Sequence, residues 1–229
     1  MIAARHHRLR YLYGAAVIAL SVALASANLL PVVATQVTIE TTSNTLNTSF
    51  FGTSPNVVYI SDQVGYSFFT NSASDMVYRK TTNGGTSWGS QVTLSSSAQY
   101  MKWAIWYDRW TPGDTTGTLV HLVMIVAATD DMYYMTLNTS GDSTSGVTNI
   151  SSSPGPAFTN TFDRSNVVSI TRATDGKLLA GVHDAGTSST SWIVSCASTC
   201  TTASNWSDTS SLLDLSLIHI SEPTRLRRI

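Results

Sequence analysis

The sequence predicts an all-β protein built from repeated four-stranded antiparallel units. Short segments with the two-residue alternation of strands follow one another through residues 56–213, separated by Gly, Asn, Asp, Ser or Pro turns. The triplet Asn-Val-Val at 56–58 recurs at 166–168, with a complete set of strands between the copies. Between residues 28 and 214 no segment has a helical period long enough to predict a helix.

The predicted strands fall into three sets of four. The first set covers residues 56–61, 65–71, 75–81 and 90–94. The second covers 100–107, 119–126, 131–137 and 145–150. The third covers 166–172, 178–183 and 191–196, with a last strand near 206–213. Turn-forming residues separate the strands within each set, which is typical of antiparallel hairpins.

The two copies of the Asn-Val-Val triplet begin 110 residues apart, which gives a repeat of 55 residues per set. Trp88 and Trp206 fall at the expected start of the fourth strand in their sets. Four-stranded repeats of this length are typical of β-propeller blades. The alternative, a β-sandwich of irregular strands, gives no reason for internal repetition. We therefore expect a partial β-propeller, with about three antiparallel blades of a larger six- or seven-bladed ring.

The N-terminus has the layout of a secretory signal peptide. Arg5, Arg8 and Arg10 precede an apolar run over residues 11–24, and the small residues at 25–27 form a cleavage pattern. The apolar run is shorter than the ~20 residues that a membrane span needs. The alternative is an uncleaved anchor, because apolar character continues beyond the cleavage pattern. Cleavage predicts a secreted protein, extracellular or periplasmic, with no stable membrane span.

The C-terminal tail differs sharply from the residues before it. Residues 215–229 contain the one basic run outside the leader, which by composition alone suggests an amphipathic or membrane-surface tail. Residues 215–225, however, resemble one reading frame of a transposase adapter used in making sequencing libraries. The resemblance implies a non-native tail and further blades of the same chain beyond Asp214. The expected segments are a signal peptide (1–27), an N-terminal segment with a candidate ring-closing strand (28–55), three blades (56–99, 100–155 and 156–214) and the tail (215–229).

Residues 28–214 carry seven basic and thirteen acidic side chains, a net charge near −6 with His neutral. An acidic segment with no basic cluster argues against nucleic acid as a partner. The two cysteines, Cys196 and Cys200, are close enough in sequence for a disulfide across a tight turn, which fits an oxidising compartment. The rival interpretation is half of a metal site, but no second pair of ligands accompanies it. We expect no metal and no cofactor.

The segment KTTNGGTSWGSQVTL, residues 80–94, contains the most recognisable motif. It resembles the Asp-box, or BNR repeat, of sialidases and other propellers, whose usual form is Ser-x-Asp-x-Gly-x-Thr-Trp. Thr81, Asn83, Gly85, Ser87 and Trp88 occupy the five motif positions. An Asx side chain closes such a turn, Gly supplies a positive φ and Trp packs against the sheet. The resemblance implies a structural role, between the third and fourth strands and on the side away from the ligand.

The resemblance also implies which loops carry a site. In sialidase-like propellers, the loops between strands two and three and those between blades share the ligand face. The expected members of this face are Asp75, Asp130, Asp131, Asp163, Arg164, His183 and Asp184. Each has a plain alternative, because Asp and His are frequent turn residues and Asp163 with Arg164 could form a structural ion pair. Arg109, Asp114, Arg172 and the Asp-box are expected on or near the opposite face.

The irregular segment 103–118 combines three Trp, a Tyr and an Asp-Arg step. These aromatics suggest either a sugar-binding platform or packing for a long loop, and packing is favoured because aromatic side chains mostly fill cores.

Two functions of different class follow. The first is a glycan- or surface-polymer-binding adhesion module. The second is a sialidase-like exo-glycosidase, whose chemistry requires three clustered Arg, a Tyr nucleophile activated by Glu, and an Asp acid/base. Residues 28–214 contain four Arg, of which only Arg164 is expected on the ligand face, and Glu40 as the sole Glu. Catalytic residues, if any, would therefore lie mostly in the further blades, and binding is the preferred function.

Overall fold

The computed structural model describes residues 37–39, 56–96, 100–126, 131–151, 167–183 and 191–209. The predicted signal peptide and C-terminal tail lie outside these residues. No helix in the described segments is long and apolar enough to cross a membrane.

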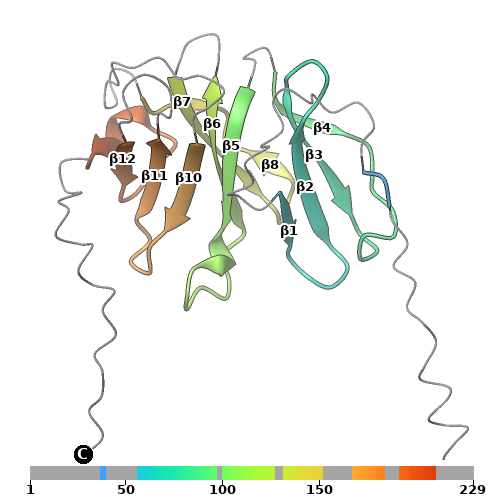
Figure 1. Ribbon diagram of the computed structural model, residues 1–229. Coiled ribbons are helices and arrows are strands. Elements are labelled where there is room, and N and C mark those ends of the chain that lie inside the picture. Colours follow the sequence, from blue (N-terminus) through green and yellow to red (C-terminus); the bar gives the residue numbers. More distant parts are fainter. Residues whose placement is uncertain are drawn as a thin grey trace, which may run out of the picture. The chain divides into compact units, whose positions relative to one another are not determined.

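The described strands form three antiparallel sheets (Figure 1). Strands consecutive in the chain pair within each sheet, except that the last strand of the second sheet pairs two strands back. The first sheet contains β1 (Val57–Tyr59), β2 (Gly65–Thr70), β3 (Met76–Thr81) and β4 (Val92–Ser95). The second contains β5 (Tyr100–Tyr107), β6 (Leu119–Val126), β7 (Asp131–Asn138), β8 (Ser143–Thr144) and β9 (Thr148–Asn149). The third contains β10 (Val167–Arg172), β11 (Leu178–His183), β12 (Ser191–Cys196) and β13 (Trp206–Asp208). Two 3-10 turns, η1 (Asp108–Trp110) and η2 (Ala203–Asn205), interrupt the hairpin loops.

The fourth strand of the second sheet is broken where one strand over 145–150 is expected. Gly146 has a φ of +77°, which takes the chain out of extended backbone between β8 and β9. Both short strands pair with β7, so they share the position of a fourth strand. At the break, the Ser145 hydroxyl accepts the Thr136 amide at 2.9 Å and takes over part of the ladder.

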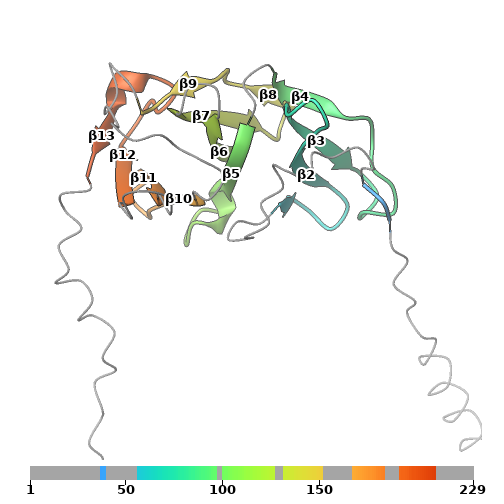
Figure 2. The ribbon, with the colours of Figure 1, turned by 45° about the horizontal axis from the view of Figure 1, so that its top comes forward.

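The second sheet is buried on both faces, as its place between the other two sheets in Figures 1 and 2 indicates. Adjacent strand residues point to opposite faces. Leu122 and Met124 of β6 therefore pack with the first sheet, whereas Val123 and Ile125 pack with the third. This double burial explains the continuous apolar character of β6. The predicted fold class is confirmed as all-β, with three blade-like antiparallel sheets that pack in chain order.

The two repeated Trp residues have different environments. Trp206 begins β13, is 3% exposed and lies 5.2 Å from the Tyr134 ring, centroid to centroid. Trp88 lies in the turn before β4, is half-buried and belongs to neither core cluster. The backbone bond from Gly89 N to Lys80 O places Trp88 at the closed end of the β3–β4 hairpin, beyond the packed part of the sheet. Trp206 therefore begins its fourth strand as expected, whereas Trp88 lies in the turn before its fourth strand and outside the core.

Leu122→Ala tests the double burial of the second sheet. Leu122 is fully buried, so its truncation should lower the free energy of unfolding by about 2–5 kcal/mol. Val147→Ala, at an exposed position between β8 and β9, is the control and should change it by less than about 0.5 kcal/mol. Urea unfolding followed by circular dichroism measures both. Equal effects would contradict the assigned core.

Candidate functional site

The residues expected on the ligand face are only partly described. Asp130, Asp163, Arg164 and Asp184 lie outside the described residues, and of His183 the structure describes the backbone at the end of β11. Asp75 accepts a hydrogen bond from Asn71 Nδ2 at 3.2 Å, within its own turn. Asp131 accepts Asn149 Nδ2 at 2.8 Å and Ser151 Oγ at 3.1 Å, which ties β7 to the segment around β9. Their ligand-binding role stays a prediction.

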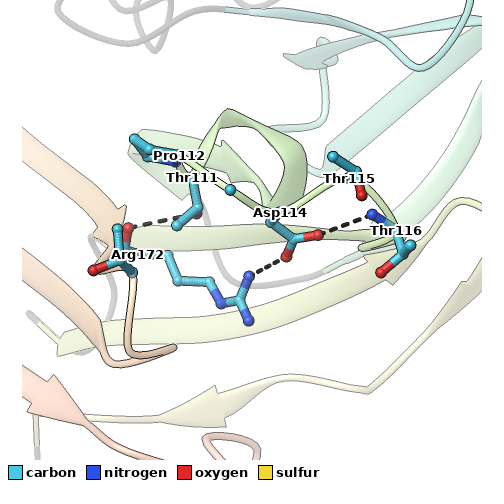
Figure 3. A pocket seen from close by; sticks show the side chains of 8 residues that line it. Thr111, Pro112, Asp114, Thr115, Thr116 and Arg172 are labelled. Carbon is cyan, nitrogen blue, oxygen red and sulfur yellow. Dashed lines mark hydrogen bonds and ion pairs between the residues drawn. The ribbon is translucent and has the colours of Figure 1, made fainter.

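The structure shows a cleft at the opposite end of the sheets, between the β5–β6 loop and the end of β10 (Figure 3). Its volume is about 390 Å³. The lining residues are polar or small: Thr111, Pro112, Gly113, Asp114, Thr115, Thr116, Arg172 and Thr174. Arg172 and Asp114, both expected away from the ligand, face each other here with Nη1 and Oδ2 2.5 Å apart.

The β5–β6 loop holds its shape through local bonds. After η1, the Thr111 amide donates to Asp108 O and the Asp114 amide donates to Thr111 O. Gly113, with a φ of +88°, allows the tight reversal between them. The Asp114 carboxylate then accepts the amides of Thr116 and Gly117 at 3.1 and 2.7 Å. These amide bonds, led by that from Gly117, and the Arg172 guanidinium hold the pKa of Asp114 below its ordinary value.

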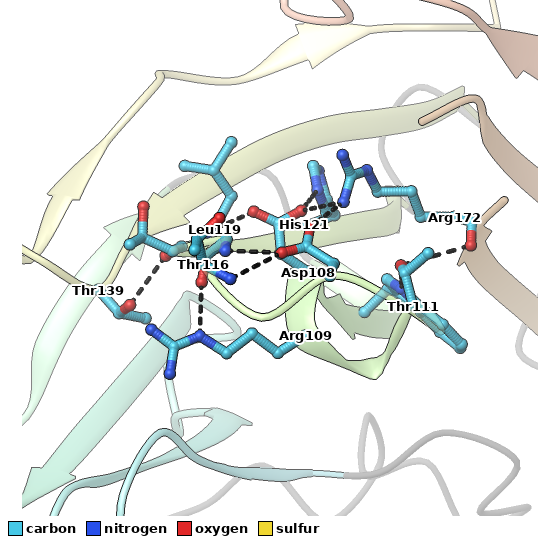
Figure 4. A network of polar contacts seen from close by, with 12 residues as sticks. Asp108, Arg109, Thr111, Thr116, Leu119, His121, Thr139 and Arg172 are labelled. Atoms are coloured by element: carbon cyan, nitrogen blue, oxygen red, sulfur yellow. Dashed lines mark hydrogen bonds and ion pairs between the residues drawn. The ribbon is translucent and has the colours of Figure 1, made fainter. Parts of the chain in front are cut away.

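A polar network extends from the cleft into the second sheet (Figure 4). Arg172 Nη1 lies 3.3 Å from Asp108 Oδ1, and the same oxygen lies 2.9 Å from His121 Nε2. Asp108 Oδ2 accepts the Leu119 amide at 2.9 Å. On its other side, His121 Nδ1 lies 2.7 Å from the Tyr134 hydroxyl. The ring of His121 thus lies between two partners, with Nε2 donating a hydrogen bond to the ionised Asp108 and Nδ1 in contact with the Tyr134 hydroxyl.

Burial shifts the pKa of Asp108 in one direction, and its hydrogen bonds and charged neighbours shift it in the other. Burial alone would raise the pKa of Asp108, but the hydrogen bonds from His121 and the Leu119 amide, with the charges of His121 and Arg172, lower it below the ordinary value. Burial raises the pKa of Tyr134, and the Asp108 charge raises it further. Asp108 is therefore a fixed carboxylate at neutral pH, and Tyr134 keeps its proton.

The arrangement is suited to binding rather than to proton transfer with a ligand. Asp108, His121 and Tyr134 are at most 6% exposed, so they cannot touch a molecule in the cleft. Asp114 and Arg172 do line it. The buried groups act by fixing Arg172, whose guanidinium bridges two carboxylates. No group of three or more His, Cys, Asp or Glu side chains suited to a metal occurs in the described part of the chain.

Sequence reasoning missed Asp108, His121 and Tyr134. The available signal was His121, a polar residue in the middle of the apolar run LVHLVMIV. Such a residue in a strand buried on both faces requires a buried partner. For Asp108 the sequence shows only an Asp-Arg step within the irregular aromatic segment 103–118.

The aromatics of that segment serve mainly as packing. Trp103 and Tyr107 are 4% and 2% exposed. Trp106 and Trp110 are half-buried, form an edge-to-face pair with centroids 5.9 Å apart, and pack against the two core clusters. The Trp106 indole donates to Thr111 Oγ1 at 3.0 Å, which braces the wall of the cleft.

Two other hairpin loops contain the Asp-box-like turn and the disulfide that the sequence predicts. The Asn83 side-chain oxygen accepts a hydrogen bond from the Ser87 amide at 2.9 Å, and Thr81 Oγ1 accepts one from the Gly85 amide at 2.9 Å. Gly85 has a φ of +88°. In the third sheet a disulfide joins Cys196 to Cys200 with Cα atoms 5.7 Å apart. The Trp206 indole donates to Cys200 O at 2.7 Å.

Gly117→Ala tests the positioning of Asp108. An added Cβ would overlap the Cβ of Asp108, so the buried carboxylate must move away from His121 and Arg172. We expect a loss of about 1–3 kcal/mol in the free energy of unfolding. Gly141→Ala is the matched control, because an added Cβ meets nothing within 4 Å there. Thermal and urea unfolding compare the two, and similar stabilities would count against this placement of Asp108.

Asp108→Asn tests the ionisation of the network. The pKa of Asp108 is lower in the folded than in the unfolded state. Its stabilising contribution is therefore present above the unfolded pKa of about 3.9 and disappears as the pH falls through the folded pKa. The stability difference between wild type and variant should be largest near neutral pH and shrink below about pH 4. Urea unfolding across this range measures it; a difference independent of pH would show that Asp108 is not held ionised.

Comparison with known proteins gives no family. No protein-family model matches the chain, and no curated protein matches it. Among solved structures, the chain is similar to a polysaccharide lyase of family PL25, an ulvan lyase, with a TM-score of 0.39 and 15% identity over 66% of this chain. A second structure, of the ulvan lyase bound to -[GlcA(1-4)Rha3S]-, matches with the same values. The chain covers 42% of each of these structures, about two fifths of their length.

Proposed function

We propose that this chain supplies blades of an exported glycan-binding β-propeller of the Asp-box type, and that the cleft beside Arg172 binds sugar hydroxyl groups. The observation that carries the proposal is the fixed Asp114–Arg172 pair in an open cleft of about 390 Å³. That volume lies within the range of about 300–1,000 Å³ typical of small-molecule sites. Three exposed hydroxyl side chains, Thr115, Thr116 and Thr174, surround the pair.

The chemistry of the lining suits a sugar. Each sugar hydroxyl both donates and accepts a hydrogen bond, so it is matched by a carboxylate, a guanidinium or a threonine hydroxyl. Asp114 and Arg172 are held before any ligand arrives, by the loop amides and by Asp108 respectively. Pre-positioned groups lose little conformational entropy on binding. A polar, hydroxyl-rich cleft therefore favours a glycan over an apolar ligand.

Two loops support the wider proposal. The Asn83 turn has the hydrogen bonds that an Asp-box needs, with Thr and Asn in place of the usual Ser and Asp. The Cys196–Cys200 disulfide fits export to an oxidising compartment.

The described arginines favour binding over the sialidase-like alternative. Arg79 donates to Gly89 O and Arg109 donates to Gly117 O, while Arg172 is paired with carboxylates. A carboxylate-gripping cluster needs several guanidinium groups turned to one point. Neither Arg79 nor Arg109 lines the cleft, so of the described arginines Arg172 alone does. Arg164 lies outside the described residues.

Asp114→Asn tests the cleft. The change keeps the side-chain size but removes a charged acceptor from the cleft and one of the two carboxylate charges that hold Arg172, so glycan affinity should fall at least about tenfold. Asp175→Asn is the matched control, because Asp175 is exposed on the neighbouring β10–β11 turn and does not line the cleft. A printed glycan array identifies the ligand for wild type, and titration calorimetry with it measures both variants. Unchanged affinity in Asp114→Asn, or an equal loss in Asp175→Asn, would place the binding site elsewhere.

A further inference from the structure

A second hollow lies beside the Asp-box turn, where the β3–β4 hairpin of the first sheet meets the β7–β8 turn of the second. Its volume is about 450 Å³. The residues that line it are Tyr78, Lys80, Thr82, Ser87, Trp88, Gly89, Ser90, Val92 and Asp142. The hollow combines one large aromatic ring, one charge of each sign and several hydroxyl groups.

Trp88 is the unexpected member of this hollow. The motif predicts a Trp that packs against its sheet, yet Trp88 is half-buried and belongs to neither core cluster. Trp206, in the third sheet, is 3% exposed and is part of a core cluster. The fastening of the Asp-box turn is completed by Thr81, Asn83 and Gly85. The Trp88 ring thus lies outside both core clusters and lines the hollow.

The two charged groups that line the hollow with Trp88 are hydrogen-bonded to each other, and Asp142 is also bonded to the first sheet. Lys80 Nζ bonds to Asp142 Oδ2 at 2.7 Å, and Tyr66 donates its hydroxyl proton to Asp142 Oδ1 at 2.6 Å. Lys80 also lies over the Tyr66 ring, 5.2 Å from its centroid. Asp142 has a φ of +54°, a backbone conformation that the turn must maintain. Lys80 and Asp142 remain 30% and 35% exposed, so they are accessible to a ligand.

We propose that this hollow is a second carbohydrate site, which binds a neutral pyranose unit of a glycan. The apolar face of the sugar would stack on Trp88, and its hydroxyls would bond to the Lys80–Asp142 pair. Trp suits this role because it offers a large, stiff contact surface at the boundary with water. The pair has no net charge, so the hollow offers no excess positive charge for a uronate or sulfate group. This site is distinct from the cleft beside Arg172, and the two proposals can fail separately.

Tryptophan fluorescence of the 229-residue chain tests the proposal. The probes are cellohexaose, maltohexaose and xylohexaose, with hexagalacturonate as the acidic comparison. At least one neutral probe should change the emission of the wild type, and Trp88→Phe should abolish that change while its melting temperature stays near that of the wild type. The proposal is overturned if no neutral probe alters the emission, or if the change survives in Trp88→Phe. It is also overturned if hexagalacturonate binds as tightly as the best neutral probe.

If Trp88→Phe does not fold, a second variant that fills the hollow with a larger side chain tests the same proposal. Ser90 is exposed and lines the hollow, so Ser90→Phe should fill it and remove the emission change. Thr93→Phe is the matched control, because Thr93 is exposed on β4 and, unlike Val92 next to it, does not line the hollow. Retention of the change in Ser90→Phe, or its loss in Thr93→Phe, would refute the site. Asp114→Asn should leave the Trp88 signal intact, and its loss there would refute the separation of the two sites.

Discussion

The burial of the second sheet on both faces is the constraint on which the rest of the structure depends. A polar side chain in such a sheet has no access to water, so it requires a partner inside the protein. His121 meets this requirement through Asp108 and Tyr134. Asp108, itself buried, is balanced in turn by Arg172 from the third sheet. The polar groups of the cleft are thus the outer members of a hydrogen-bonded network that begins in the core.

A polar contact also links the second sheet to each of its two neighbouring sheets. One carboxylate of the second sheet reaches across each junction: Asp108 to Arg172 on one side, and Asp142 to Tyr66 and Lys80 on the other. Each of the two hollows lies beside one of these carboxylates. The groups that line the hollows belong to hairpin loops held by rigid sheets, which is where binding residues are commonly found.

Sequence periodicity was enough to predict the strands but not the contacts between them. The bounds of β5 and β6 follow from their nearly continuous apolar and aromatic residues and from the Pro and Gly of the loop between them. The break at Gly146 was missed, because a single Gly in a strand pattern does not show its φ. Asp108 and His121 were missed for a different reason, since only the return of β6 along β5 brings them together. Burial of Trp88 was expected from its motif, but burial depends on what the neighbouring sheet places opposite the turn.

Both hollows lie at the same end of the second sheet, because the loops after β5 and after β7 of a meander emerge on one side. A repeating polymer could then occupy both at once. The second contact would be made at high effective concentration, so two individually weak sites would together hold a long chain with avidity that no short fragment could match. The spacing between the hollows is set by paired strands rather than by a flexible linker. It would therefore select polymers by the length of their repeat.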